Sequence, residues 1–364
     1  MEKIMFVMPN LSGGGAEKVL IDIINNIDIE KFEVTVVLFK KEGVYLKSIP
    51  TNVKLISMSD KLKGSWRIWY KLFYIFPNFF YKLFVKENFD IEIAFMEGWA
   101  TKFVANSNNK GSKKIAWVHC DIFSKHWTNH MFKKNEESEC YNKFNEIIFV
   151  SNDSKGQFNK LFKNIKTKQK IIYNPVIADD VYRKANEQVI KFEEFTFISV
   201  GRLDQQKGFD RLIEAHSRIV KKYPHKLIIL GEGLRRREIE KQVFQLGIGK
   251  SVELMGFKKN PYPYIKAADA FICSSRSEGY SLVVVESIIL GKAILSTNVN
   301  GPKEILENGK YGLICENSID GIENSMKMIL KDRSLVGFYE QKSEEKQKFL
   351  DYEKCIKEIE DLFQ

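Results

Sequence analysis

Three short loops combine glycine with charged side chains, and each follows an apolar run and precedes a segment of helical spacing. The first reads Ser12-Gly13-Gly14-Gly15-Ala16-Glu17. Consecutive glycines let the backbone approach a ligand, and the following helix directs N–H groups and its positive dipole end at an anion. The P-loop is excluded because no Gly-Lys-Ser/Thr follows, and Lys18 stands where the dinucleotide fingerprint needs its last glycine. This loop indicates an anion site; the alternative is a tight turn that requires positive φ.

The second loop, residues 200–208, contains two cations five residues apart. Arg202 lies at the end of an expected strand, and Lys207 lies at the start of the next helix. A helix dipole disfavours a positive charge at that end, so Lys207 is better explained if an anion also binds there. The alternative is a pair of solvated surface charges.

The third loop, residues 274–282, introduces two carboxylates. Glu278 precedes the expected helix, and Glu286 lies eight residues later among apolar residues. A carboxylate in such surroundings is costly unless something binds it, although a solvent-facing glutamate is the alternative. The helix start should also present backbone N–H groups to a phosphate. These N–H groups belong to Tyr280, Ser281 and Leu282.

Short apolar strands alternate with amphipathic helices along the whole chain. This alternation predicts an α/β fold of doubly wound parallel sheets, which bind ligands at the carboxyl ends of their strands. Helices are expected at 16–25, 124–143, 208–222 and 233–246. Strands are expected at 3–8, 33–39, 53–57, 91–95, 113–118, 146–150 and, more weakly, 169–172, and then at 195–200, 226–230, 252–255, 269–273, 292–296 and 311–315.

The length of 364 residues exceeds what one compact core usually holds, so two domains are expected. The first should cover 1–175 and the second 195–334, with the boundary near Asn174-Pro175 and a charged connection between them. The charged tail, 335–364, should be helical and could pack on either domain, including back on the first.

The composition of the chain indicates which classes of partner it could bind and in which cellular compartment it is found. Lys and Arg outnumber Asp and Glu by 57 to 47, which suits phosphates, nucleotides, nucleic acid or an anionic membrane. The five cysteines are dispersed, which argues against disulfides or a zinc site and for a reducing compartment. We also expect neither a signal peptide nor a transmembrane helix. The chain is therefore predicted to be cytoplasmic.

These features together resemble the family 4 retaining glycosyltransferases. The matching pieces are the GGGAE loop, GRLDQQKGFDRLIEAH at 201–216, GEGLRRREIE at 231–240, and the stretch 256–306 with two glutamates separated by seven residues. The resemblance is continuous from about 195 to 316 but limited in the first half. Ser281 and Ser287 replace the glycine and alanine of many members. The resemblance implies the GT-B fold, in which two Rossmann-like domains face each other across a cleft.

The resemblance also implies roles for individual residues. Arg202 and Lys207 would hold the donor diphosphate and stabilise the departing nucleoside diphosphate without a metal. Glu286 would accept hydrogen bonds from the ribose, and Glu278 would face hydroxyls of the transferred sugar. The remaining donor contacts would come from Gly14 and Gly15 at the phosphates, Phe257 at the base, and the amides of Tyr280, Ser281 and Leu282 at the distal phosphate.

On the acceptor side, His119 follows the expected strand 113–118 and matches a family histidine near the reacting sugar. On spacing alone, a lone histidine is more often structural. Glu97 is a weaker candidate. The family retains the anomeric configuration, and the preferred mechanism has the leaving phosphate accept the acceptor's proton on the same face of the sugar.

Residues 61–90 interleave six basic residues with eleven aromatic ones. This composition is typical of a helix lying in an anionic membrane interface. Two sets of residues would contact the membrane. The aromatic side chains would enter the headgroup boundary, and the basic ones would bind the anionic lipid. The aromatic set is Trp66, Trp69, Phe73, Phe76, Phe80 and Phe84, and the basic set is Lys61, Lys63, Arg67, Lys71 and Lys82. The main alternative is a buried helix with snorkelling lysines. Single-stranded nucleic acid is a third alternative, disfavoured because no nucleic-acid motif accompanies the segment.

The sequence therefore predicts a metal-independent hexosyl or N-acetylhexosaminyl transferase that needs no cofactor. The donor should be a nucleotide sugar, with UDP favoured. The acceptor should be a polyprenyl-diphosphate-linked or surface-polysaccharide glycan, such as capsule, at the inner face of the cell membrane. The alternatives are a nucleotide-sugar epimerase of the same fold and a non-catalytic nucleotide-sugar-binding protein. An NAD-dependent oxidoreductase is disfavoured because the fingerprint is missing.

Overall fold

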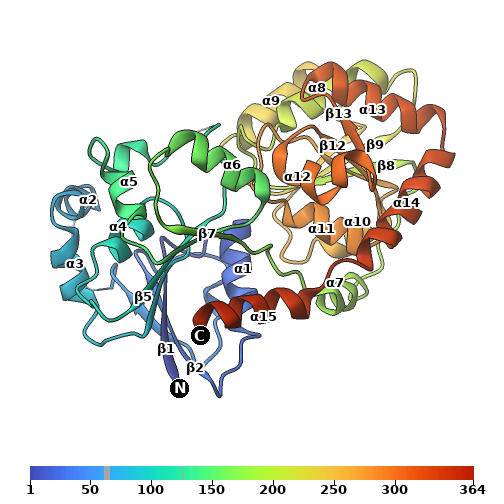
Figure 1. Ribbon diagram of the computed structural model, residues 1–364. Helices are drawn as coiled ribbons and strands as arrows, with labels where there is room; N and C mark the ends of the chain where they lie inside the picture. Colours follow the sequence, from blue (N-terminus) through green and yellow to red (C-terminus); the bar gives the residue numbers. More distant parts are fainter. Residues whose placement is uncertain (61–65, 125) are drawn as a thin grey trace. The chain divides into compact units, whose positions relative to one another are not determined.

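The computed structural model describes residues 1–60, 66–124 and 126–364, without the side chains of residues 66 and 67. The chain forms two compact units, shown by element in Figure 1. The first comprises Met1–Pro175 together with Glu353–Gln364, and the second comprises Val176–Tyr352. Each unit is built on its own parallel sheet, as the alternation of strands and helices predicts.

The sheet of the first unit has the order β3-β2-β1-β4-β5-β6-β7 in the described residues. Strand β1 therefore pairs with β2 on one side and β4 on the other, with Ile4 opposite both Val34 and Ile91. This reversal of strand order is where open sheets bind ligands, and the glycine loop follows β1 there. The strands are β1(Glu2–Met8), β2(Phe32–Leu38), β3(Lys54–Ser57), β4(Ile91–Ala94), β5(Lys113–Val118), β6(Glu146–Phe149) and β7(Lys168–Ile171).

The helices of the first unit include one from the far end of the chain. Phe363, in the last helix, packs edge-to-face against Phe6 and Phe32, with ring centroids 6.0 and 5.6 Å away. The carbonyl of Leu362 accepts a hydrogen bond from Lys113 Nζ at 2.7 Å. The helices are α1(Gly15–Ile24), α2(Trp66–Ile75), α3(Pro77–Phe84), α4(Trp99–Ala105), α5(Glu136–Tyr141), α6(Asn152–Leu161) and α15(Tyr352–Phe363), with 3-10 turns at Leu46–Ser48 and Asn129–Met131.

The sheet of the second unit has the order β10-β9-β8-β11-β12-β13, so its reversal lies between β8 and β11. The loops 200–208 and 274–282 follow these two strands. The strands are β8(Thr196–Val200), β9(Lys226–Leu230), β10(Val252–Gly256), β11(Ala270–Cys273), β12(Ala293–Thr297) and β13(Leu313–Cys315). The helices are α7(Ala178–Ala185), α8(Phe209–Ile219), α9(Arg236–Gln245), α10(Tyr262–Ala267), α11(Leu282–Ile289), α12(Asn300–Ile305), α13(Ile319–Lys331) and α14(Ser334–Gln347), with a 3-10 turn at Glu307–Gly309.

Every expected strand forms, with ends within two residues of the expected positions. The helix expected over 124–143 is wrong, because the described residues of this range, all but 125, form only a 3-10 turn and the short α5. Asn135 has a left-handed backbone with φ 65°, which a helix interior does not accommodate. Glu137 also accepts hydrogen bonds from the Thr128 hydroxyl and the His126 ring, both at 2.7 Å, and these folded-back contacts replace a continuous helix.

The aromatic-basic segment divides between core and surface. Phe73, Phe80 and Phe84 are buried, so for these three the interpretation as a buried helix is correct and membrane insertion is wrong. Lys61 and Lys63 lie outside the described residues, as do the side chains of Trp66 and Arg67. No helix in the described ranges is long and apolar enough to cross a membrane. The apolar side chains exposed on α2 and α3 are Ile68, Leu72, Ile75, Phe76 and Phe79.

Candidate functional site

Gly208 allows the two loops of the second unit to approach closely. Its φ of +68° is left-handed, and a Cβ at this position would lie 2.2 Å from the carbonyl oxygen of Ser274. The Ser274 hydroxyl in turn donates to the carbonyl of Lys207 at 2.8 Å. A side chain at position 208 would therefore push the start of α8 away from the loop after β11.

This approach brings together two predicted site residues, Lys207 and Glu278. The ammonium of Lys207 donates to Glu278 Oε1 at 2.6 Å, and the Ser275 hydroxyl donates to the same oxygen, also at 2.6 Å. Burial by itself lowers the pKa of the Lys207 ammonium and is the largest single effect. The charge and hydrogen bond of Glu278, with contributions from Cys273 and Asp204, together outweigh it, so the pKa lies above its ordinary value. Lys207 is therefore a charged group beside a carboxylate that is only 6% exposed.

A second ion pair, missed from the sequence, holds the same two loops. Arg276 donates to both carboxylate oxygens of Asp210, at 2.8 and 2.7 Å. Its backbone N–H also donates to the carbonyl of Gln206 at 2.7 Å. Burial raises the pKa of Asp210, but the guanidinium of Arg276 outweighs this and brings the pKa below its ordinary range. Nothing in the local spacing of these residues, which are 66 positions apart, marks them as partners.

Glu286 is buried in α11, with 4% of its surface exposed. Its Oε1 accepts a hydrogen bond of 2.9 Å from the hydroxyl of Tyr262, the first residue of α10. The cost of a carboxylate among apolar neighbours is thus offset by a polar partner, and the solvent-facing alternative is wrong. Ser281 occupies the N-cap of α11, so Tyr280, Ser281 and Leu282 lie at the helix start as expected.

The other predicted donor residues of the second unit are more exposed. The side chain of Arg202 is 63% exposed, and its Nε lies 3.6 Å from Asp204. Phe257 follows β10 and is 48% exposed. Each lies directly beyond the carboxyl end of a strand in the sheet that also carries Lys207 and Glu278.

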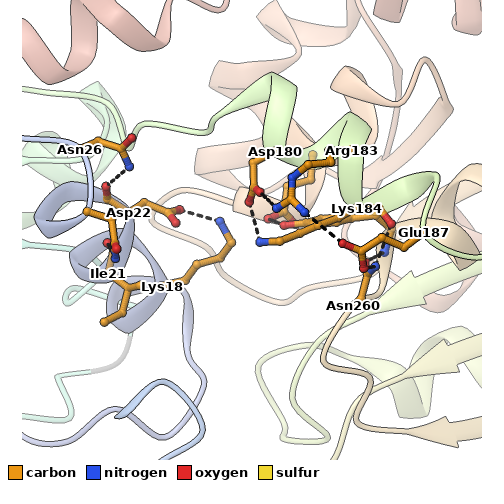
Figure 2. A network of polar contacts seen from close by, with 12 residues as sticks. Lys18, Ile21, Asp22, Asn26, Asp180, Arg183, Lys184, Glu187 and Asn260 are labelled. Atoms are coloured by element: carbon orange, nitrogen blue, oxygen red, sulfur yellow. Dashed lines mark hydrogen bonds and ion pairs between the residues drawn. The ribbon is translucent and has the colours of Figure 1, made fainter. Parts of the chain in front are cut away.

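The glycine loop of the first unit encloses an acidic side chain. Gly13 has a left-handed φ of +109°, and Gly14 is the N-cap of α1. A Cβ at Gly14 would lie 2.2 Å from the carboxylate of Glu17, which is 8% exposed. A side chain at this position would therefore displace the Glu17 carboxylate. One turn further along α1, the ammonium of Lys18 donates to Asp22 at 2.6 Å (Figure 2).

Glu97 holds the backbone that carries His119. One carboxylate oxygen of Glu97 accepts the N–H groups of His119 and Cys120, at 2.6 and 3.0 Å. The His119 ring lies 4.8 Å from that of Phe95 and stacks on Trp117 with an interplanar angle of 9°. Burial lowers the pKa of His119 to about 3, so its imidazole is neutral near pH 7. Within the described residues, its ring nitrogens have no hydrogen-bond partner.

Comparison with known proteins places these features in context. Residues 180–349 match the family described as glycosyl transferases group 1. The chain is 28% identical to the N-acetylgalactosamine-N,N'-diacetylbacillosaminyl-diphospho-undecaprenol 4-alpha-N-acetylgalactosaminyltransferase of Campylobacter jejuni over 98% of each chain. It is 34% identical, over 47% of this chain and 48% of the relative, to an uncharacterized glycosyltransferase of Methanocaldococcus jannaschii.

Solved structures establish the fold over the full chain. Anabaena HepE, in complex with UDP and glucose, has a TM-score of 0.78 at 19% identity and covers 100% of this chain and 99% of that chain. Staphylococcus aureus TarM has the same TM-score at 15% identity, with full coverage of both chains. The expected GT-B fold of two Rossmann-like parallel-sheet domains is confirmed.

Proposed function

We propose that this chain is a retaining glycosyltransferase, because residues 180–349 match the family of glycosyl transferases group 1 and the whole chain has the GT-B fold. It would transfer a hexosyl or N-acetylhexosaminyl group from a UDP-sugar to a polyprenyl-diphosphate-linked glycan. The observation that carries the proposal is the charged Lys207 beside the buried Glu278, at the sheet reversal of the second unit. Support for the donor comes from HepE, which binds UDP, and for the acceptor from the undecaprenol-linked substrate that the Campylobacter transferase's name specifies.

In the proposed reaction, Lys207 and Arg202 bind the donor diphosphate and stabilise the negative charge that develops as the sugar bond breaks. Glu278 accepts hydrogen bonds from hydroxyls of the sugar, and Glu286 accepts them from the ribose. The remaining donor contacts are those of Gly14, Gly15, Phe257 and the helix-start amides 280–282. No metal is required for this charge stabilisation.

On the acceptor side, His119 acts as a neutral hydrogen-bonding group beside the reacting sugar, because its lowered pKa disfavours the imidazolium. The leaving phosphate accepts the proton of the attacking hydroxyl on the same face of the sugar. The new bond therefore forms on the side from which the nucleoside diphosphate departs, and the anomeric configuration is retained.

The experiment that tests this function is sugar transfer to an undecaprenyl-diphosphate-linked N-acetylhexosamine acceptor. The purified protein is incubated with UDP-N-acetylgalactosamine, UDP-N-acetylglucosamine, UDP-galactose and UDP-glucose, with and without EDTA. We expect an extended lipid-linked glycan and free UDP with one donor, at the same rate with EDTA. Conversion of the donor sugar to its epimer without an acceptor would favour an epimerase, and loss of transfer that magnesium restores would contradict the metal-independent mechanism.

We further propose that the apolar surface of α2 and α3 docks the enzyme on an anionic membrane at its inner face. Phe76 and Phe79 are 56% and 59% exposed, and Lys71 and Lys82 are exposed beside them. Aromatic side chains can enter the headgroup boundary, while each cation adds about 1 kcal/mol at an anionic leaflet. Docking would give the cytoplasmic enzyme access to a polyprenyl-linked acceptor.

The double substitution Phe76→Ser/Phe79→Ser should release the protein from liposomes that contain anionic lipid. Both side chains are exposed, so the melting temperature should stay close to that of the parent. Binding of the parent should also weaken with salt, which screens the lysines. The matched control is Phe244→Ser, which removes a phenylalanine that is 85% exposed in the second unit. Unchanged co-sedimentation of the double variant would show that this surface does not bind the membrane.

A further inference from the structure

Tyr262 and Glu286 form a buried pair that joins two helices of the second unit. The phenol hydroxyl donates to Glu286 Oε1 at 2.9 Å, and each side chain is 4% exposed. We propose that Tyr262 is a positioning residue, which fixes the Glu286 carboxylate in the orientation that binds the ribose hydroxyls of the donor. This inference rests on the proposed function, because the ribose contact of Glu286 is part of it.

The position of Tyr262 is itself fixed by its neighbours in the chain. It lies between Pro261 and Pro263, whose rings restrict the backbone on both sides. Its N–H donates to Asn260 Oδ1 at 3.2 Å. The amide of Asn260 donates to the carbonyl of Lys184 at 2.8 Å and to the Glu187 carboxylate at 2.9 Å, as Figure 2 shows. The turn that begins α10 is thus attached to the end of α7.

The end of α7 carries ion pairs of its own around the groups that Asn260 contacts. Asp180, in the first turn of α7, accepts hydrogen bonds from the Lys184 ammonium, at 2.5 Å, and from the Arg183 guanidinium. Arg183 also donates to the Glu187 carboxylate at 3.2 Å (Figure 2). These contacts order the side chain and the carbonyl to which Asn260 donates. A shift of the backbone at Tyr262 would therefore break the hydrogen bonds that Asn260 makes with Lys184 and Glu187.

The chemistry of the phenol suits this task. A neutral O–H group can hold one carboxylate oxygen while the carboxylate keeps its negative charge, which it needs to accept further hydrogen bonds. A lysine or arginine would neutralise that charge. The helix that carries Glu286 is also anchored, because Gln347 donates to the carbonyls of Ile288 and Ile289 at 2.6 and 2.7 Å. Both the backbone and the side chain of Glu286 are thus held before a ligand arrives, which lowers the cost of binding.

The test compares the binding of UDP with that of 2′,3′-dideoxy-UDP by calorimetry, in the parent protein and in Tyr262→Phe. Hydrogen bonds to a charged group make the parent prefer UDP by about 10–100-fold. We expect Tyr262→Phe to reduce this preference by about tenfold and to raise KM for the donor, while KM for the acceptor stays unchanged. Tyr264→Phe is the matched control, because it removes a hydroxyl from the same helix and leaves the Tyr262–Glu286 hydrogen bond in place.

Three results separate the inference from the function on which it rests. If the parent does not prefer UDP over the dideoxy ligand, the ribose role of Glu286 in the proposed function is wrong. If the parent prefers UDP and Tyr262→Phe keeps the full preference, the positioning role is overturned. In a Glu286→Gln background, Tyr262→Phe should have no further effect on the preference, and an equal loss in both backgrounds would also overturn it.

A second variant covers the case in which Tyr262→Phe lowers the melting temperature strongly. Asn260→Ala leaves the phenol in place and removes the attachment of the turn to α7, together with the acceptor of the Tyr262 N–H. The preference for UDP should then fall in the same direction but by a smaller factor, and a full preference in this variant would contradict the role of the turn.

Discussion

The substitution Lys207→Met is expected to reduce sugar transfer by about 10²–10³-fold, because it removes a positive charge directed at the leaving diphosphate. It should also lower the free energy of unfolding of the second unit. Glu278 would keep the hydrogen bond from Ser275 but lose its ion-pair partner. Breaking a buried ion pair from one side costs about 3–5 kcal/mol, and the 21% exposure of the Lys207 side chain places this case toward the lower value.

The double variant Lys207→Met/Glu278→Gln separates the two effects. With both charges removed, most of the lost stability should return while transfer stays low. Steady-state transfer rates and thermal melting, measured on the same preparations, give both quantities. Lys241→Met, on the exposed surface of α9, is the control for removing a lysine. A single variant that transfers sugar at more than a tenth of the parent rate would show that Lys207 does not stabilise the leaving group.

The second unit is expected to lose stability in acid because of two buried histidines. His216 lies 2.9 Å from both His225 Nε2 and the Ser251 hydroxyl, and His225 Nδ1 lies 2.6 Å from the carbonyl of Tyr223. Burial, with a contribution from His225, lowers the pKa of His216 to about 3. Burial also lowers the pKa of His225, and the charge of Arg333 acts in the same direction.

An unfolded histidine titrates near 6.5, so below that pH the unfolded state takes up a proton that the folded state refuses. Stability is therefore complete above about pH 6.5 and declines as the pH falls toward 3. At pH 4.5, His216 alone should cost about 2–3 kcal/mol of the free energy of unfolding. The variant His216→Gln, whose amide can still donate to His225 and accept from Ser251, should remove this part of the decline.

Hydrogen exchange of the β8 and β9 backbone measures this effect in the second unit alone. Tryptophan fluorescence would not serve, since all five tryptophans lie before residue 128, in the first unit. His130→Gln, at an exposed position, is the control and should leave the acid dependence unchanged. Equal opening free energies of the β8 and β9 amides in the parent at pH 7 and pH 4.5, each corrected for the intrinsic exchange rate at that pH, would contradict the prediction.

Local patterns were sufficient to predict the strands and the loops that follow them. Central strands of parallel sheets are buried on both faces, so they appear as continuous apolar runs such as Ile4–Met8. A glycine-containing loop that follows such a run marks the carboxyl end of the strand, where sites form. This is why Gly14, Gly208 and Gly279 could be located before any three-dimensional information.

Contacts between distant residues could not be predicted in this way. The pairs Lys207–Glu278, Asp210–Arg276 and Tyr262–Glu286 join positions 71, 66 and 24 residues apart. Their partners are chosen by strand order and loop packing, which leave no local spacing to detect. In α3, the neighbouring residues Phe79 and Phe80 have the same side chain and opposite exposure, because successive residues of a helix point to different sides of it.

The return of α15 to the first unit affects how the protein can be made during translation. Phe6 and Phe32 leave the ribosome before the whole of the second unit, yet Phe363, which packs against both, leaves after it. In the sequence, all residues of the second unit come after Phe32 and before Phe363. The second unit can therefore finish folding while the first unit still lacks part of its core. A gene fragment ending at Pro175 would leave that apolar face uncovered, whereas a fragment encoding Val176–Tyr352 carries the second unit whole.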